Sequence, residues 1–202
     1  MTDLSGYHVE QTFEGLSLGD ESIERAEYER CTFRRCRFDG TRFDDVRFVD
    51  CTLEDCDLVG VKVPNTLFAD VRFQGGRAMG VDFTTLRSLT IRVSFQDVRM
   101  DYCNFSGLRL RNLVFRDCGL REATFDNCDL QGASFPGCDL TDAVLRQADL
   151  RDTDLRDTRG AFFDPRTCRL KGTKVDPETA VLVLGTLGIE SPGLMDLLGL
   201  SE

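Results

Sequence analysis

The sequence predicts an all-β solenoid, a four-sided parallel coil that is closed at its C-terminal end by a short helix. Three observations predict this fold. An apolar residue, which we call a centre, recurs at every fifth position from Phe13 to Val175 with few exceptions. A small residue such as Ala, Cys, Val or Thr stands two places before most centres. After Val175 the five-residue pattern gives way to a helical one.

The period of five fits neither an α-helix nor a flat strand. Their apolar positions recur every three to four residues and every two residues. Short fixed periods are typical of solenoids. Five residues can form one side of a square coil, so twenty form one turn, and successive turns stack as parallel ladders about 4.8 Å apart. The centre and the small residue two before it then point inward, and the other three residues face water.

The centres fall into two blocks of seventeen, from Phe13 to Val93 and from Phe95 to Val175. Together they predict about 8.5 coils and a rod roughly 40 Å long. Two residues are inserted between the blocks, within residues 84–95, and a bulge or a corner is the simplest account. We therefore expect a cap segment over residues 1–10 and a solenoid over residues 11–175. The centres that break the apolar pattern are Ala78, Ser88, Gly160 and Pro165.

Composition predicts a single cooperative module. The chain has 202 residues, of which 41% are apolar and 30% charged. It contains no run of eighteen apolar residues and no basic and apolar leader, so we expect a cytoplasmic protein that neither spans a membrane nor is exported. The formal charge of −10 argues against nucleic-acid binding through a basic face and favours basic partners.

All nine cysteines stand two places before a centre, where the repeat needs a small buried residue. Three pairs are twenty residues apart, so their α-carbons stack within bridging range. Without an export signal we expect reduced thiols. A four-cysteine zinc site is a remote alternative, since such ligands usually come in short CxxC loops. The stacked pairs are Cys31 with Cys51, Cys36 with Cys56, and Cys118 with Cys138.

The sequence offers little material for catalysis. His8 is the only histidine and precedes the expected repeat, so neither a Ser-His-Asp triad nor a histidine-rich metal site can be assembled. The carboxylates lie on a convex surface and lack a pocket. The run GGRAMG at 75–80 lacks the Lys-Ser/Thr ending of a phosphate loop. We expect no catalytic, cofactor or metal site, and no enzyme.

Acidic residues gather at one repeat position, two places after a centre. Because residues twenty apart stack, Asp97, Asp117 and Asp157 should form a column with Gly137 in the gap. Two interpretations stay open. The acids belong to a mixed, solubilising surface in which arginines interleave, or their columns imitate the phosphates of a DNA duplex. The acids at this position are Asp20, Asp45, Asp50, Asp55, Asp70, Asp97, Asp117, Glu122, Asp142, Asp152 and Asp157.

Several five-residue units resemble a known repeat. CDLQG, CDLTD, ADLRD and TDLRD, within residues 128–157, are similar to the A(D/N)Lxx signature of the pentapeptide-repeat proteins. The resemblance implies a right-handed quadrilateral β-helix over most of the chain.

Two segments narrow the resemblance. Residues 64–83, PNTLFADVRFQGGRAMGVDF, resemble the corresponding segment of the topoisomerase-protecting group that includes AlbG, McbG and the Qnr proteins. Residues 173–190, TKVDPETAVLVLGTLGIE, are similar to the end of those proteins and of MfpA. Members of this group mimic B-form DNA, bind DNA gyrase where its DNA segment would lie, and protect it from quinolones or natural poisons such as albicidin. The matching positions in the first segment are Pro64, Phe68, Val71, Phe73, Met79 and Gly80.

Residues 176–202 should form a helical cap. Asp176 can cap a helix that has Pro177 at its first position and runs to about Leu187 before Gly188. A second short helical pattern starts at Ser191 and Pro192 and includes Leu194, Leu197 and Leu198. Both pieces either plug the rod or form a dimer interface, and the resemblance implies the latter. Our candidates for the homodimer interface are Val183, Leu184 and Leu187.

These observations lead to one functional hypothesis and one alternative. A dimeric acidic rod would occupy the basic DNA-gate saddle of DNA gyrase or a related type II topoisomerase, conferring antibiotic resistance or self-immunity, with no direct contact to nucleic acid. The alternative is a scaffold or regulatory rod that touches no topoisomerase. The expected charged contacts are Asp97, Asp117 and Asp157, with Asp45, Asp50 and Asp70 in the first block.

Overall fold

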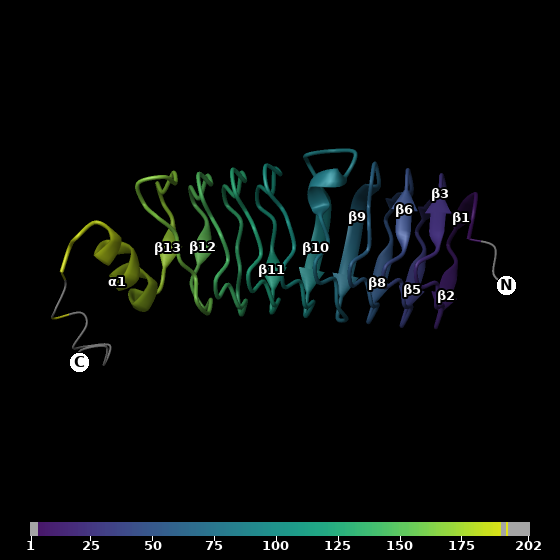
Figure 1. Cartoon of the computed structure of the whole chain (residues 1–202), viewed down its shortest axis with the longest axis horizontal. Coiled ribbons are helices and arrows are strands. Elements are labelled where there is room, and N and C mark those ends of the chain that lie inside the picture. Colours follow the sequence, from purple (N-terminus) through teal and green to yellow (C-terminus); the bar gives the residue numbers. More distant parts are fainter. Residues whose placement is uncertain (1–3, 191–192, 194–202) are drawn as a thin grey trace.

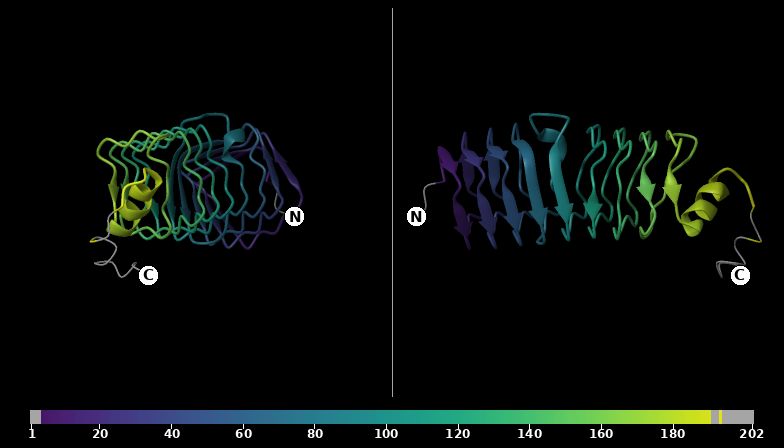
Figure 2. Two further views of the ribbon diagram at one scale, coloured as in Figure 1. Left: turned by 60° about the vertical axis from the view of Figure 1, so that its left-hand side comes forward. Right: turned by 180° about the vertical axis from the view of Figure 1, so that it is seen from behind.

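A computed structural model describes residues 4–190 and 193, which form a rod with the two termini at opposite ends (Figure 1). The wall of the described rod is parallel, and each strand pairs with a strand one coil before it, one coil after it, or both. Seen obliquely toward the end of the rod, successive coils repeat a similar four-sided outline (Figure 2). The four-sided parallel solenoid predicted from the period of five is confirmed.

Most strands are short because each occupies one side of the square. β9 (Leu67–Gln74) is the longest, and it runs around a corner to pair with two strands of the preceding coil. The strands before it are β1 (Tyr7–Val9), β2 (Thr12–Glu14), β3 (Ser22–Glu24), β4 (Glu27–Glu29), β5 (Thr32–Arg34), β6 (Arg42–Asp44), β7 (Arg47–Val49) and β8 (Thr52–Glu54). The elements after it are the 3-10 helix η1 (Phe83–Thr85), β10 (Arg92–Gln96), β11 (Phe115–Arg116), β12 (Asp154–Leu155), β13 (Lys174–Val175) and the helix α1 (Pro177–Thr186).

The register of the ladder is twenty residues except around the change of frame. Phe13 pairs with Phe33, whereas Phe73 pairs with Phe95, and the register shifts between Arg92 and Val93. The two additional residues are accommodated in the segment between η1 and β10, which projects from the rod (Figure 1). At the N-terminal end, β1 already pairs with β4. The ladder therefore begins within residues 1–10, which the sequence predicts to be a cap.

The interior is a stack of aromatic and aliphatic side chains. Phe95, Phe115 and Phe135 stack at centroid spacings of 5.3 and 5.0 Å with interplanar angles of 8° and 4°. Eight of the nine cysteines are buried and all are free thiols, which suits the small inward position. Buried threonines at the same position donate to a carbonyl of the preceding coil, as Thr66 Oγ1 does to Phe43 O at 2.8 Å. The repeat therefore satisfies these polar atoms internally.

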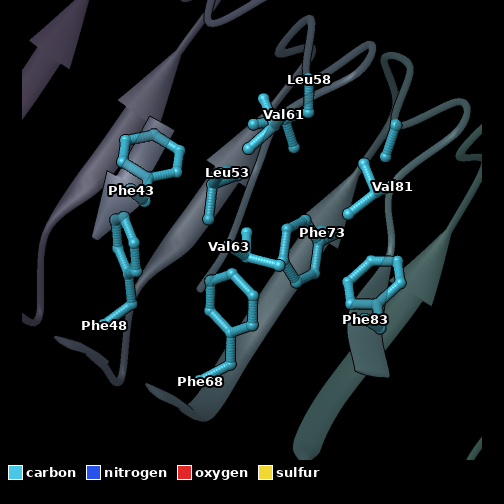
Figure 3. A pocket seen from close by; sticks show the side chains of 11 residues that line it. Phe43, Phe48, Leu53, Leu58, Val61, Val63, Phe68, Phe73, Val81 and Phe83 are labelled. Carbon is cyan, nitrogen blue, oxygen red and sulfur yellow. The ribbon is translucent and has the colours of Figure 1, made fainter. Parts of the chain in front are cut away.

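One small cavity interrupts this core. It has a volume of ≈20 Å³ and lies where the centre is Ala78 rather than Leu or Phe. Figure 3 shows the apolar side chains around it. The residues lining it are Phe43, Phe48, Leu53, Leu58, Val61, Val63, Phe68, Phe73, Ala78, Val81 and Phe83.

The C-terminal end is closed by α1, which ends at Thr186, one residue before the expected Leu187. Asp176 is the N-cap residue, but its side chain makes no capping hydrogen bond. Its carboxylate instead accepts the backbone N–H of Asp157 at 2.7 Å, so it caps the ladder rather than the helix. The residues that predict the second helical pattern, Ser191, Pro192, Leu194, Leu197 and Leu198, lie outside the described residues. Within the described part of the chain, no helix has the length and hydrophobicity needed to cross a bilayer.

Candidate partner-binding surface

The repeat position that carries the acids is a corner of the square with left-handed backbone. Ten of the eleven acids there have φ between 50° and 60°, and Asp20 is the exception. Among residues with a side chain, Asp and Asn tolerate this conformation best, and glycine adopts it freely. Asn65, Asn112 and Asn127 accordingly share the position. The recurrence of aspartate therefore has a backbone cause that is independent of its charge.

Asp97, Asp117 and Asp157 follow one edge of the rod. Asp97 N donates to Arg116 O at 3.0 Å, and Asp117 N donates to Pro136 O at 2.9 Å, so their corners are stacked one coil apart. Gly137 N donates to Asp157 O at 3.0 Å and continues the edge. We call Asp97, Asp117 and Asp157 the aspartate column.

The carboxylate of Asp117 fills the gap that Gly137 leaves in this column. A Cβ atom on Gly137 would collide with Asp117 Oδ1, so the carboxylate points along the rod axis toward the next coil. Asp55 is related to Gly75 in the same way. Glycine at these corners thus leaves room for the carboxylate of the preceding coil.

The other three predicted contacts lie elsewhere. Asp45 and Asp50 occupy successive corners of one coil, and Asp70 stacks above Asp50 with Asp50 N donating to Ala69 O. The column begins on the next corner of the square. The six aspartates therefore occupy three corners, and the structure does not gather them into one patch.

Two of these three aspartates are neutralised. Asp45 forms an ion pair with Arg87 of the projecting segment and accepts a hydrogen bond from Asn65 Nδ2 at 3.1 Å. Asp70 forms an ion pair with Arg92 at 2.9 Å. Within the described residues, Asp50 and the aspartate column form no ion pair.

Arginines interleave mainly with acids on the flat sides of the square. Arg156 pairs with Asp154 at 2.7 Å and Arg151 pairs with Asp149 at 2.6 Å, each along a single side. Arg156 holds the pKa of Asp154 down at about 2, because its hydrogen bonds and charge favour the carboxylate. Acids on the sides are thus largely paired with arginine, whereas the aspartate column forms no ion pair within the described residues.

A shallow hollow lies beside the column. Gly119 has no side chain at an outward position where neighbouring coils carry arginine and aspartate, which opens a space of ≈540 Å³. Its wall mixes both signs of charge. The charged residues lining it are Arg77, Asp97, Arg99, Asp101, Asp117, Arg121 and Asp139.

The three residues proposed for a dimer interface have different environments. Val183 packs against the core of the rod, Leu184 is half-buried, and Leu187 is 46% exposed. Leu182 and Ile189, which are 49% and 48% exposed, were missed. The sequence offered no helical signal for this pair, because Ile189 follows Gly188, where the helix has already ended.

The part of the chain that the structure describes contains no cluster of three or more His, Cys, Asp or Glu residues able to hold a metal ion. His8 lies at a centre of the first coil and stacks on Tyr28, with ring centroids 5.1 Å apart. Its Nε2 lies 2.9 Å from Ser5 O. His8 therefore packs at the end of the rod and remains partly exposed.

Comparisons with known proteins agree with this architecture. A family model described as a pentapeptide repeat region matches residues 26–92, and one described as pentapeptide repeats (8 copies) matches residues 118–157. A trypsin-treated variant of QnrB1, a plasmid-mediated fluoroquinolone resistance protein, superposes with a TM-score of 0.67 at 20% identity over 93% of this chain and 99% of that chain. A second trypsin-treated QnrB1 variant gives 0.57 at 23% identity over 92% and 99%. No curated protein sequence matches significantly.

Proposed function

The chain belongs to the pentapeptide-repeat family, and from that premise we propose that it mimics DNA, binds DNA gyrase or a related type II topoisomerase, and protects it from a poison such as a quinolone or albicidin. The observation that carries the proposal is the aspartate column of Asp97, Asp117 and Asp157. These carboxylates follow one edge of a rod of formal charge −10 and form no ion pair within the described residues.

The charge density of the column can be compared with that of DNA. Successive coils are about 4.8 Å apart, whereas one DNA strand carries a phosphate roughly every 3.4 Å. A filled column therefore has somewhat less charge per unit length than a DNA strand. It would steer the rod toward a basic saddle and make binding sensitive to salt.

The C-terminal end is the proposed homodimer interface. Leu182, Leu187 and Ile189 leave an apolar outer surface on and just after α1, and burial of such surface favours association. Leu184 would contribute its exposed part, and Val183 would support the helix from beneath. Two rods joined there would present two acidic edges to a two-fold symmetric enzyme. Leu187→Glu should halve the mass measured by light scattering, and an unchanged mass would exclude this interface.

The test of the column uses asparagine. Asp97→Asn, Asp117→Asn and Asp157→Asn together remove three charges, and asparagine tolerates the left-handed corner, so the fold should persist. A control with Asp20→Asn, Asp142→Asn and Asp152→Asn makes the same changes at other corners. We expect weaker gyrase binding for the first variant only. Equal binding of both variants would remove this edge from the proposal.

Protection is measured separately. Supercoiling by gyrase is followed as the protein is titrated with and without a poison, and cleaved DNA is scored. Restored supercoiling with fewer cleavage complexes is expected. Inhibition alone would support DNA mimicry without a resistance role, and no effect at high excess would contradict the proposal.

A second candidate function is a scaffold that binds another basic protein. The dispersion of the six aspartates over three corners and the paired arginines on the sides favour it, because such a surface is mixed rather than uniformly acidic. Weak gyrase binding together with tight binding to a different basic protein would select it.

A further inference from the structure

Within the described residues, the N-terminal end of the rod leaves the outer edge of the ladder without a partner strand. β1, β2 and β3 belong to the first coil, and within the described residues each pairs with a strand of the second coil only. The outer edge of such strands presents unpaired backbone groups that can pair with another chain. A second copy of this protein is the most similar ladder available, so stacking of rods would be the expected hazard.

The first coil differs from the others at its inward positions. Gln11 and Glu21 stand two places before the centres Phe13 and Ile23, where the rest of the repeat carries only apolar residues, Gly or Thr. Both are exposed at the mouth of the rod, whereas Cys31 and Thr41, which occupy the same positions one coil later, are 1% and 0% exposed. Because Gln11 and Glu21 are ten residues apart, they lie on opposite sides of the square.

The first coil is also uniformly acidic in sequence. Residues 1–24 contain no Lys or Arg. The second coil balances two of these acids, since Arg30 pairs with Glu10 at 2.9 Å and Arg35 pairs with Glu14. Within the described residues Glu21 takes part in no ion pair. The acids in this stretch are Asp3, Glu10, Glu14, Asp20, Glu21 and Glu24.

We propose that Gln11 and Glu21 form a charged stop that prevents a second copy from stacking on the N-terminal edge. If another coil covered this end, the Glu21 carboxylate would be enclosed in an apolar lumen without a cation, which is strongly unfavourable. Two N-terminal ends brought together would also place acids against acids. Inward-pointing charges are a known way to protect sheet edges. Stacking at this end is therefore prevented, and the rod keeps a fixed length whatever its partner is.

The test replaces both residues with the small residue that the repeat prefers. The Gln11→Ala and Glu21→Ala double variant should show a concentration-dependent rise in mass of at least twofold over the unmodified protein, measured by light scattering. The control, Gln131→Ala with Glu122→Ala, makes the same changes on a side and at a corner of the rod, away from its end, and should keep the unmodified mass. Energy transfer between dyes attached to N-termini identifies the end that associates.

The proposal is overturned if the double variant keeps the unmodified mass at every concentration, or gains mass without energy transfer between N-termini. Circular dichroism establishes that the variants are folded. If the double variant is not folded, Glu21→Gln decides, because it keeps the shape of the side chain and removes only the charge. Glu21→Gln should show a smaller rise in mass than the double variant, together with energy transfer between N-termini. If its mass does not rise, the role of the charge is refuted.

Discussion

The cavity beside Ala78 leads to a quantitative prediction. Ala78 occupies a centre where the repeat usually carries Leu or Phe, and its side chain lines an apolar cavity of ≈20 Å³. Such a cavity stays dry, because a water molecule there would lack polar partners. Ala78→Val adds two methyl groups on the cavity side and should stabilise the rod.

The expected gain follows from two contributions. Filling the cavity recovers about 0.5 kcal/mol at roughly 24 cal/mol per Å³. Burying two further carbon atoms contributes about 1.6 kcal/mol at roughly 0.8 kcal/mol each. Loss of rotamer freedom and imperfect fit oppose these terms, so we expect a net gain of about 1 kcal/mol. The melting temperature should then rise by about 2–4 °C for a chain of this size.

The measurement is urea unfolding followed by circular dichroism, with a matched substitution as control. Ala133 is also fully buried, but it does not line the cavity. Ala133→Val should therefore overpack the core and destabilise it by about 1–3 kcal/mol. If Ala78→Val destabilises the protein as much as Ala133→Val does, the cavity is not available to the added methyl groups and the reasoning fails.

Three further predictions concern the backbone and one carboxylate. Gly76→Ala should destabilise the protein by at least about 2 kcal/mol, because φ is +77° and the new Cβ would collide with the backbone of the preceding coil. The control Gly80→Ala, with φ of +69° and no atom within 4 Å of the new Cβ, should cost about 1 kcal/mol. Equal losses of stability in urea unfolding would contradict the collision. Arg25→Asn at φ 54° should stabilise by up to about 1 kcal/mol in the same assay, and a loss would show that the arginine is needed there. Arg156 lowers the folded-state pKa of Asp154 to about 2. The Asp154 carboxylate therefore stabilises the folded protein fully above the unfolded-state pKa of about 3.9, and this stabilisation is lost as the pH falls through about 2. The stability difference between the unmodified protein and Asp154→Asn should therefore shrink from pH 5 to pH 2, and a constant difference would exclude this linkage.

The fold could be predicted from the sequence because one geometry accounts for the period of five. The aspartate column followed from the same arithmetic, since Asp97 and Asp117 are twenty residues apart. The backbone reason for these acids was also encoded. Asn65 and Asn112 share the corner position with aspartate and glycine, and this set of residues indicates left-handed backbone rather than charge alone.

Other features depend on contacts that the period does not determine. The ion pair between Asp45 and Arg87 forms across the projecting segment, where the frame changes and the register cannot be counted. The exposure of Leu182 and the packing of Val183 depend on how α1 is rotated about its own axis at the rod end. A helix with apolar residues on several sides does not specify that rotation from sequence.

Because the register is constant after β10, whole coils of twenty residues could be removed from this part of the rod. From Phe95 onward the paired residues that we describe are twenty apart, as Phe95 with Phe115 and Leu155 with Val175 are. Excision of residues 118–137 would remove one coil, join equivalent positions of the flanking coils, and shorten the rod by about 4.8 Å. An excision of twenty residues across the segment between η1 and β10 would join unlike positions. The rod can thus be lengthened or shortened one coil at a time on the C-terminal side of the insertion. The contacts between neighbouring coils there stay of the same kind.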